Sequence, residues 1–190
     1  MQFNLKRSFA GMMILRVVRW NLSERGVHLF VRCGGQYREM IEGVKVKNLV
    51  RHPDDRGFFQ EILRDDDGLL ERFGQASMAK TYPGVIKAFH YHEYQDDLWF
   101  FPVGNAQVVL HDLRENSPTY RETNVFYMGE DNPILLLIPK GVAHGYRTLG
   151  EKPAIIIYFT TRSYNRENPD EKRLPYDDPS IGFDWTTKMR

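Results

Sequence analysis

The chain has 190 residues, of which 42% are hydrophobic and 27% charged, a size that suits one domain or one domain with an extension. Its single cysteine, Cys33, excludes a disulfide framework and a cysteine-based zinc ribbon. The net charge of +1 is the sum of two parts with opposite charge. Residues 1–39 are basic, with seven Lys and Arg against two Glu, whereas residues 40–190 are mildly acidic, with 19 Lys and Arg against 23 Asp and Glu.

The basic segment over residues 1–39 shows no clear periodicity, cap or turn signal of a folded element. Three interpretations stay open: a transit-like targeting segment, a basic arm that binds a polyanion, or translated sequence upstream of the native start. The third is favoured, because Met40 opens the first strand-like segment of the body. For the mildly acidic body we expect neither nucleic acid nor membrane as a partner, since no apolar run approaches the about 18 residues of a membrane span.

From Val44 onward, short apolar runs rich in Val, Ile, Phe and Tyr alternate with turn residues, a pattern that predicts β-strands without intervening helices. The expected strands are residues 44–50, 57–62, 85–91, 98–103, 106–113, 124–128, 134–138 and 154–160. Residues 104–105 predict a hairpin turn, and residues 68–72 predict a helical turn or two. The continuous apolar run at 135–138 predicts a strand buried on both faces. The body is therefore expected to be an all-β sandwich, jelly roll or barrel.

One group of residues can bind a metal. His90 and His92 lie two apart on an expected strand and so face the same side. Asp97 follows, and His144 is expected from a later strand. Imidazole and carboxylate ligands of this kind suit Fe, Mn, Zn or Ni. The set indicates either a divalent-metal site or a polar sugar pocket without a metal, and both alternatives stay open.

The spacing G-x5-H-x-H-x4-D-x6-G, followed by P-x-G-x-x-H, resembles the two motifs of the cupin superfamily. The flanking segments resemble the dTDP-4-dehydrorhamnose 3,5-epimerase family more closely. They read DDRGFFQE at 54–61, QAS at 75–77, DLRENSPT at 112–119, IPKGVAHGY at 138–146 and DDPSIGFDW at 177–185. The segments follow the family's order from about residue 44 to 185. The resemblance implies a cupin-type jelly-roll barrel, a homodimer, a cytoplasmic location and a nucleotide-linked keto-sugar as substrate.

The resemblance also implies a role for each matching residue. Epimerisation beside a ketone needs a base to remove a carbon-bound proton, a stabiliser for the enolate and an acid on the opposite face. The resemblance puts the base at His90 and the acid at Tyr158, with no cofactor. Residues implied to contact the nucleotide, the diphosphate or the sugar are Arg56, Phe59, Glu61, Gln75, Lys87, His144 and Tyr164. Arg56 is expected at the diphosphate, if need be from across a dimer interface.

Two positions depart from the family pattern. The family has Lys where Asp97 stands and Gln where His92 stands, so both changes introduce metal-ligating side chains. The family's carboxylate partner of the catalytic histidine lies beyond the Trp-containing segment, and here Asp97, Asp177 or Asp178 is the expected substitute. In a metal-binding relative, a divalent ion would polarise the substrate carbonyl and His90 would be a ligand instead of the free base.

Three functions from different classes follow. The first is an epimerase or isomerase of a nucleotide-activated deoxy sugar, serving the synthesis of cell-surface polysaccharide precursors. The second is a metal-dependent cupin enzyme acting on a small polar substrate. The third is a non-catalytic carbohydrate-binding cupin. The first is favoured in its broad form, because the ordered family motifs span nearly the whole body.

Overall fold

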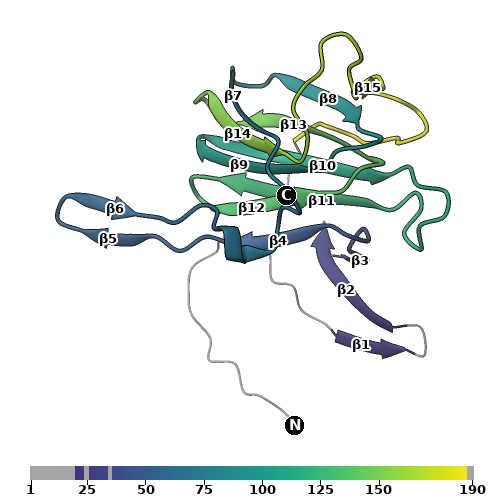
Figure 1. Ribbon diagram of the computed structural model, residues 1–190, viewed down its shortest axis with the longest axis horizontal. Helices are drawn as coiled ribbons and strands as arrows, with labels where there is room; N and C mark the ends of the chain where they lie inside the picture. Colours follow the sequence, from purple (N-terminus) through teal and green to yellow (C-terminus); the bar gives the residue numbers. More distant parts are fainter. Residues whose placement is uncertain (1–19, 24–25, 34–35, 188–190) are drawn as a thin grey trace.

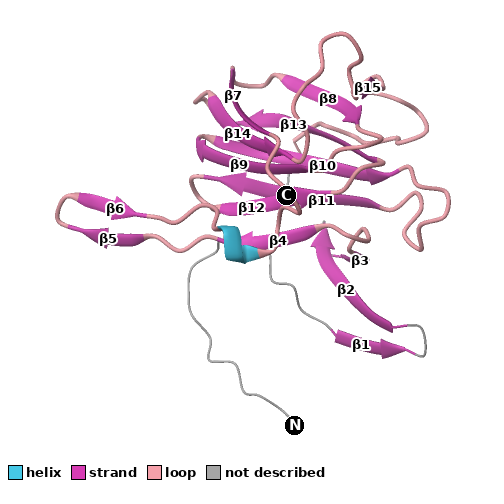
Figure 2. Ribbon diagram, viewed as in Figure 1, coloured by secondary structure: helices cyan, strands magenta, loops and turns pink. Residues whose placement is uncertain are grey.

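The computed structural model describes residues 20–23, 26–33 and 36–187, which form strands and one helical turn (Figures 1 and 2). The strands are β1 (Trp20–Ser23), β2 (Gly26–Cys33), β3 (Gln36–Glu39), β4 (Lys45–Asn48), β5 (His52–Asp54), β6 (Gly57–Phe59), β7 (Gln75–Thr81), β8 (Ile86–Tyr91), β9 (Asp97–Val103), β10 (Asn105–Asp112), β11 (Thr123–Gly129), β12 (Ile134–Ile138), β13 (Val142–Leu149), β14 (Ala154–Thr160) and β15 (Lys172–Arg173). The described part of the chain contains no helix that is both long and apolar enough to cross a membrane.

Two five-stranded antiparallel sheets make the body of the protein. Their strand orders are β11-β10-β13-β8-β15 and β4-β12-β9-β14-β7. Buried side chains from both sheets form one main core, for example Trp99 and Phe101 of β9 with Leu110 of β10 and Phe126 of β11. The described residues thus confirm the all-β class that the alternating apolar pattern predicted.

Both sheets are also covered on their outer faces. Residues between β6 and β7, such as Leu69 and Leu70, pack against the outer side of β9 and β12. Residues near the C-terminus, including Trp185, pack against the outer side of β8, β10 and β13. All five residues of β12 are therefore buried and contribute alternately to the two clusters, which confirms the prediction for its apolar run.

Two local predictions were wrong. Gly104 and Asn105 do not close a hairpin, because β9 pairs with β12 and β14 whereas β10 pairs with β11 and β13. The chain instead crosses between the sheets at Gly104, which has φ 69° and where a Cβ would lie 2.5 Å from the carbonyl oxygen of Pro153. The helical turn expected at 68–72 is instead the 3-10 turn η1 (Asp65–Asp67), which ends at Gly68.

Two smaller units lie outside the two large sheets. Strands β5 and β6 form a hairpin that projects from the body (Figure 1), so the strand expected at 57–62 ends at Phe59. Strands β1, β2 and β3 form a small sheet within the basic segment, whose residues 1–19, 24–25 and 34–35 lie outside the described part of the chain. Met40 and Ile41 are buried in the main core, and the domain boundary at residue 40 stays a prediction.

Candidate functional site

An irregularity in the pairing of β8 with β13 aligns the polar side chains of the site. His144 pairs with His90 and Tyr146 pairs with Lys87, so a step of two residues on β13 spans three residues on β8. This bulge places Lys87 and His90 on the same face of β8, although strand alternation alone would separate them. Gly145 permits the close approach, because a Cβ at that position would lie 2.3 Å from the Cβ of Ala88.

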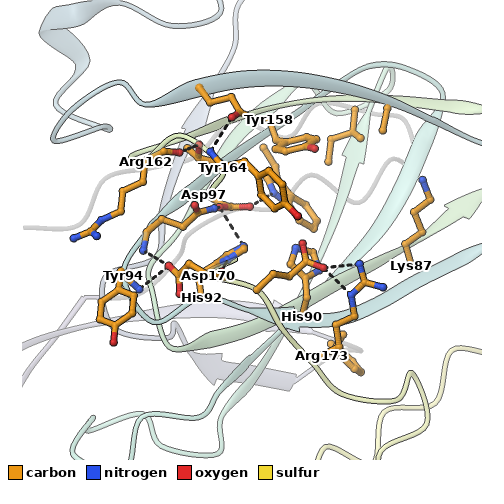
Figure 3. Close-up of a pocket in the computed structure, with 18 of the residues that line it drawn as sticks. Lys87, His90, His92, Tyr94, Asp97, Tyr158, Arg162, Tyr164, Asp170 and Arg173 are labelled. Carbon is orange, nitrogen blue, oxygen red and sulfur yellow. Dashed lines mark hydrogen bonds and ion pairs between the residues drawn. The ribbon is translucent and has the colours of Figure 1, made fainter. Parts of the chain in front are cut away.

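Three histidines and one aspartate meet on the inner side of this bulge. His90 belongs to β8, His92 follows it, Asp97 opens β9 and His144 belongs to β13. One possible ligand atom from each of these four residues lies within 4.8 Å of the others. Figure 3 shows His90, His92 and Asp97 gathered together. The structure therefore brings together the four residues that the sequence singled out.

Backbone carbonyls orient two of the imidazoles. The Nδ1 atom of His144 lies 2.8 Å from the carbonyl oxygen of Val142, and Nδ1 of His92 contacts the carbonyl oxygen of Asp170. A carbonyl oxygen can only accept, so each Nδ1 carries a proton and the Nε2 atom of a neutral ring is left as an acceptor. These Nε2 atoms lie 3.6 Å (His92) and 3.7 Å (His144) from the two carboxylate oxygens of Asp97.

Asp97 is an anion inside the barrel. Its side chain accepts hydrogen bonds from Nε2 of Gln95 at 2.9 Å and from Nε1 of Trp99 at 3.1 Å. Burial raises the pKa of Asp97, but the three neighbouring histidines, His144 first, outweigh burial and hold that pKa below its usual value. Burial, followed by the field of His144, lowers the pKa of His90, whose ring is therefore neutral.

A cavity of about 1200 Å³ lies beside this cluster and is large enough for a nucleotide sugar. The predicted site residues that line it are Gln75, Lys87, His90, His92, Asp97, Tyr158 and Tyr164. His144 is 2% exposed and lies behind His90, with the ring centroids 4.1 Å apart. Tyr158 belongs to β14 in one large sheet and His90 to β8 in the other (Figure 3), so the two side chains reach the cavity from different sheets.

Residues 162–173, here called the strap, line one side of the cavity and carry functional candidates that the sequence analysis missed. Arg162, Asp170 and Arg173 all face the cavity. The Asp170 carboxylate accepts hydrogen bonds from the backbone N–H groups of residues 93–95, which ties the strap to the turn after β8. Arg173 pairs with Glu171 at 2.7 Å and lies opposite His90 in the pairing of β15 with β8. Within this segment, only Tyr164 had been singled out from the sequence.

Three predicted site residues lie away from the chain's own cavity. Arg56 is in the turn of the β5–β6 hairpin, where its side chain is 85% exposed and pairs with Asp54. Phe59 is 66% exposed, and Glu61 follows the same hairpin. None of the three lines the cavity. Asp177 and Asp178 do not line the cavity either. Of the three aspartates expected to replace the family's carboxylate partner of the catalytic histidine, Asp97 is therefore the one that lies beside His90.

The D-x-R-x-x-S-P-T motif forms a structural network apart from the cavity. Asp112 is fully buried and accepts hydrogen bonds from Arg114, Ser117 and Thr119. Arg114 also donates to the carbonyl oxygen of Glu42 at 2.8 Å, which ties this loop to the start of the body. Burial raises the pKa of Asp112, but these hydrogen bonds outweigh it and lower that pKa to about 2.

Comparison with known proteins decides the family. The family model for dTDP-4-dehydrorhamnose 3,5-epimerase matches residues 38–190. This chain belongs to that family. The spore coat polysaccharide biosynthesis protein SpsL of Bacillus subtilis (strain 168) is 73% identical over 151 residues, which cover 80% of this chain and 100% of SpsL. A probable low-salt glycan biosynthesis epimerase of Haloferax volcanii is 38% identical, with 78% of this chain and 97% of the relative covered.

Solved structures support the same conclusion. The crystal structure of dTDP-6-deoxy-D-glucose-3,5-epimerase from Legionella pneumophila Philadelphia 1, in complex with dTDP-4-keto-L-rhamnose, matches with a TM-score of 0.69 at 30% identity. The match covers 76% of this chain and 79% of that chain. The predicted family, the cupin-type jelly-roll fold and the enzyme class, a sugar-nucleotide epimerase, are thereby confirmed.

Proposed function

We propose that this enzyme epimerises a nucleotide-activated 4-keto-deoxy sugar, as a dTDP derivative, during synthesis of a cell-surface polysaccharide precursor. The observation that carries the proposal is the placement of His90 and Tyr158 in one large cavity, from strands of different sheets. Inversion beside a ketone needs a base and an acid on opposite sides of the sugar ring. The name of SpsL and the ligand of the Legionella enzyme support the pathway and the substrate class.

The cavity offers a group for each step. The neutral imidazole of His90 removes the proton from the carbon beside the ketone, and the Tyr158 hydroxyl returns a proton to the opposite face of the enolate. The basic side chains of Lys87, Arg162 and Arg173 face the same space and can bind the diphosphate. The ring of Tyr164 offers a stacking surface for the base of the nucleotide.

Isotope exchange tests this mechanism. In D₂O, the wild-type enzyme should introduce deuterium beside the ketone of dTDP-4-keto-6-deoxyglucose, as followed by NMR and mass spectrometry. His90→Asn should slow exchange by about 10²–10⁴-fold, because the general base is lost. Tyr158→Phe should still exchange but give little epimerised product. Tyr176→Phe is the matched control, because that exposed tyrosine does not line the cavity. Exchange by His90→Asn at the wild-type rate would disprove the assignment of the base.

We also propose that the enzyme is a homodimer in which the β5–β6 hairpin of one copy completes the cavity of the other. The exposure of Arg56 and Phe59 on a projecting hairpin supports this arrangement (Figure 1). Arg56 would then contact the diphosphate, as the family resemblance implies. A cytoplasmic location agrees with a chain whose single cysteine, Cys33, cannot form an internal disulfide.

The functional unit proposed here is residues 40–190. The family model begins at residue 38, and the 151 residues aligned with SpsL equal the length of residues 40–190. Residues 1–39 contribute no residue to the cavity among those that the structure describes. Mass spectrometry of protein from its native host tests whether the basic segment is made, and a peptide from residues 1–30 would rule out a start at Met40.

Two alternative functions have their own tests. Metal-dependent catalysis is favoured by the convergence of His90, His92, Asp97 and His144, and metal analysis of the purified protein tests it. A carbohydrate-binding role without catalysis would be supported if a panel of keto-sugar nucleotides bound without exchange or turnover. Family membership favours the epimerase over both alternatives.

A further inference from the structure

We propose that Tyr146 is a further catalytic residue, whose hydroxyl group donates a hydrogen bond to the ketone oxygen of the sugar and stabilises the enolate. This inference rests on the proposed function, because it assigns the enolate stabiliser of that reaction. Tyr146 belongs to β13 and lines the cavity, and it is 4% exposed. Removal of the proton beside a ketone places negative charge on the ketone oxygen, and a donor aimed at that oxygen lowers the barrier.

Two kinds of contact hold the side chain of Tyr146 in place. Its hydroxyl oxygen lies 2.7 Å from the hydroxyl oxygen of Thr81, which is 2% exposed. Thr81 ends β7 in one large sheet, whereas β13 belongs to the other, so this hydrogen bond joins the two sheets beside the cavity. The Tyr146 ring packs edge to face against Trp99 and Phe101, with ring centroids 5.6 Å and 5.1 Å apart. The hydroxyl is therefore oriented before a substrate binds.

This pair of hydroxyl groups has one proton more than it uses. Each hydroxyl can donate one proton, and the hydrogen bond between Tyr146 and Thr81 takes one of the two. Neither hydroxyl makes a second hydrogen bond to a residue that the structure describes. Tyr146 lines the cavity and Thr81 does not. When Thr81 donates to Tyr146, the Tyr146 proton is therefore free for an acceptor in the cavity, and a substrate oxygen supplies that acceptor.

The indole of Trp99, which lines the cavity, relates Tyr146 to the proposed base and acid. The ring centroids of His90 and Tyr146 lie 6.0 Å and 5.6 Å from that of Trp99. Tyr158 stands opposite Trp99 in the pairing of β14 with β9. A sugar ring bound beside the indole is thus surrounded by all three groups. Because the base and the acid act on carbon, the Tyr146 hydroxyl is the member of this set that is left for the ketone oxygen.

Tyr146 can donate at neutral pH, whereas its neighbour His144 cannot. Burial raises the pKa of Tyr146 and outweighs the hydrogen bond with Thr81, which lowers that pKa, while the nearby Tyr158 adds to the increase. The Tyr146 hydroxyl therefore keeps its proton. His144 lies two residues earlier on the same face of β13, but its Nδ1 proton is directed to the carbonyl oxygen of Val142. The Nε2 atom of that neutral ring has no proton to offer to an enolate.

Deuterium exchange by the Tyr146→Phe variant of the full chain tests the proposal. With dTDP-4-keto-6-deoxyglucose in D₂O, the variant should both exchange and epimerise about 100-fold more slowly than wild type, because one donor to the enolate oxygen is lost. The dissociation constant of dTDP, which has no sugar ketone, should stay within about threefold of wild type. Thr81→Val should slow both reactions about tenfold, since Tyr146 keeps its proton but loses its orienting partner. Tyr127→Phe is the matched control, because that hydroxyl pairs with Gln107 and does not line the cavity.

The outcomes separate this proposal from the proposed function. If wild type exchanged deuterium and Tyr146→Phe exchanged at the same rate, the proposed function would stand and the role of Tyr146 would be overturned. Exchange at the wild-type rate with loss of product alone, the result expected for Tyr158→Phe, would make Tyr146 an acid and equally overturn the proposal. The absence of exchange by wild type would contradict the proposed function itself.

A purely structural hydrogen bond gives a different result. It would lower the urea midpoints of Tyr146→Phe and Thr81→Val without slowing exchange by the folded protein, and that result would also overturn the proposal. Circular dichroism checks the fold of each variant. If Tyr146→Phe does not fold, Thr81→Val decides, because wild-type exchange by that variant would show that the oriented hydroxyl is not needed.

Discussion

Replacing Gly145 with alanine tests whether the bulge between β8 and β13 sets the geometry of the site. The new Cβ would lie 2.3 Å from Cβ and 2.6 Å from Cα of Ala88, and 2.8 Å from the carbonyl oxygen of Lys87. Because carbon atoms in contact lie about 3.5 Å apart, the strands must separate by roughly 1 Å. Overpacking lowers the free energy of unfolding by about 1–3 kcal/mol. Alanine also reduces the conformational entropy of the unfolded chain, which raises the free energy of unfolding by roughly 0.5 kcal/mol. The free energy of unfolding should therefore fall by about 1–2 kcal/mol.

Catalysis should suffer more than stability. A displacement of about 1 Å between Lys87 and His90 should lower kcat/KM about 100-fold. The assays are urea unfolding and deuterium exchange into the keto-sugar. Gly150→Ala is the matched control: at φ 73° with nothing within 4 Å of the new Cβ, it costs a similar roughly 1–2 kcal/mol but leaves the bulge intact. If Gly145→Ala kept wild-type kcat/KM, or if both variants lost activity equally, the bulge would not position the site.

Two further predictions concern charged residues. Asp112→Asn should lower the free energy of unfolding by about 2–4 kcal/mol at pH 7, because Arg114 loses its buried partner. Since the folded pKa of Asp112 lies near 2, below the usual value of 3.8, its contribution is present above pH about 4 and is lost as the pH falls to about 2. Acid unfolding should show this loss in wild type and not in the variant, and identical profiles would refute it. Lys87→Ala should raise KM by about 10–100-fold with a smaller change in kcat, and an unchanged KM in steady-state kinetics would remove Lys87 from the diphosphate.

The sequence predicted those features that depend on local pattern. The run at residues 134–138 is apolar at every position, so burial on both faces could be inferred from the residue types alone. The convergence of His90 with His92 follows from strand alternation, and that of Asp97 and His144 from the family spacing. Residues 112–119 could be recognised as a family motif. The sequence could not show whether this motif has a structural or a catalytic role, because that depends on where the loop packs.

Other features depend on contacts between distant segments. β7 is a polar edge strand with alternating exposure, and its sequence QASMAKT carries few strand-forming residues. The bulge that brings Lys87 into line with His90 arises from pairing with Gly145, far along the chain. Arg173 reaches the cavity because the strap returns to pair with the edge of β8. No local signal specifies any of these, since each requires knowledge of a neighbour that is remote in sequence.

The two departures from the family pattern, His92 and Asp97, can be compared by the charge that each brings to the cavity. In the proposed reaction, the lysine that the family resemblance implies at position 97 would place one positive charge beside the enolate oxygen, whereas Asp97 would place one negative charge there. In the metal-dependent alternative, a divalent ion bound to that carboxylate would restore a local net charge of +1, and His92 would supply a second ligand. Without an ion, the buried carboxylate of Asp97 would repel the developing oxyanion of the proposed reaction. Under that metal-dependent alternative, His92 and Asp97 would act as one unit, and the presence of each would explain the other.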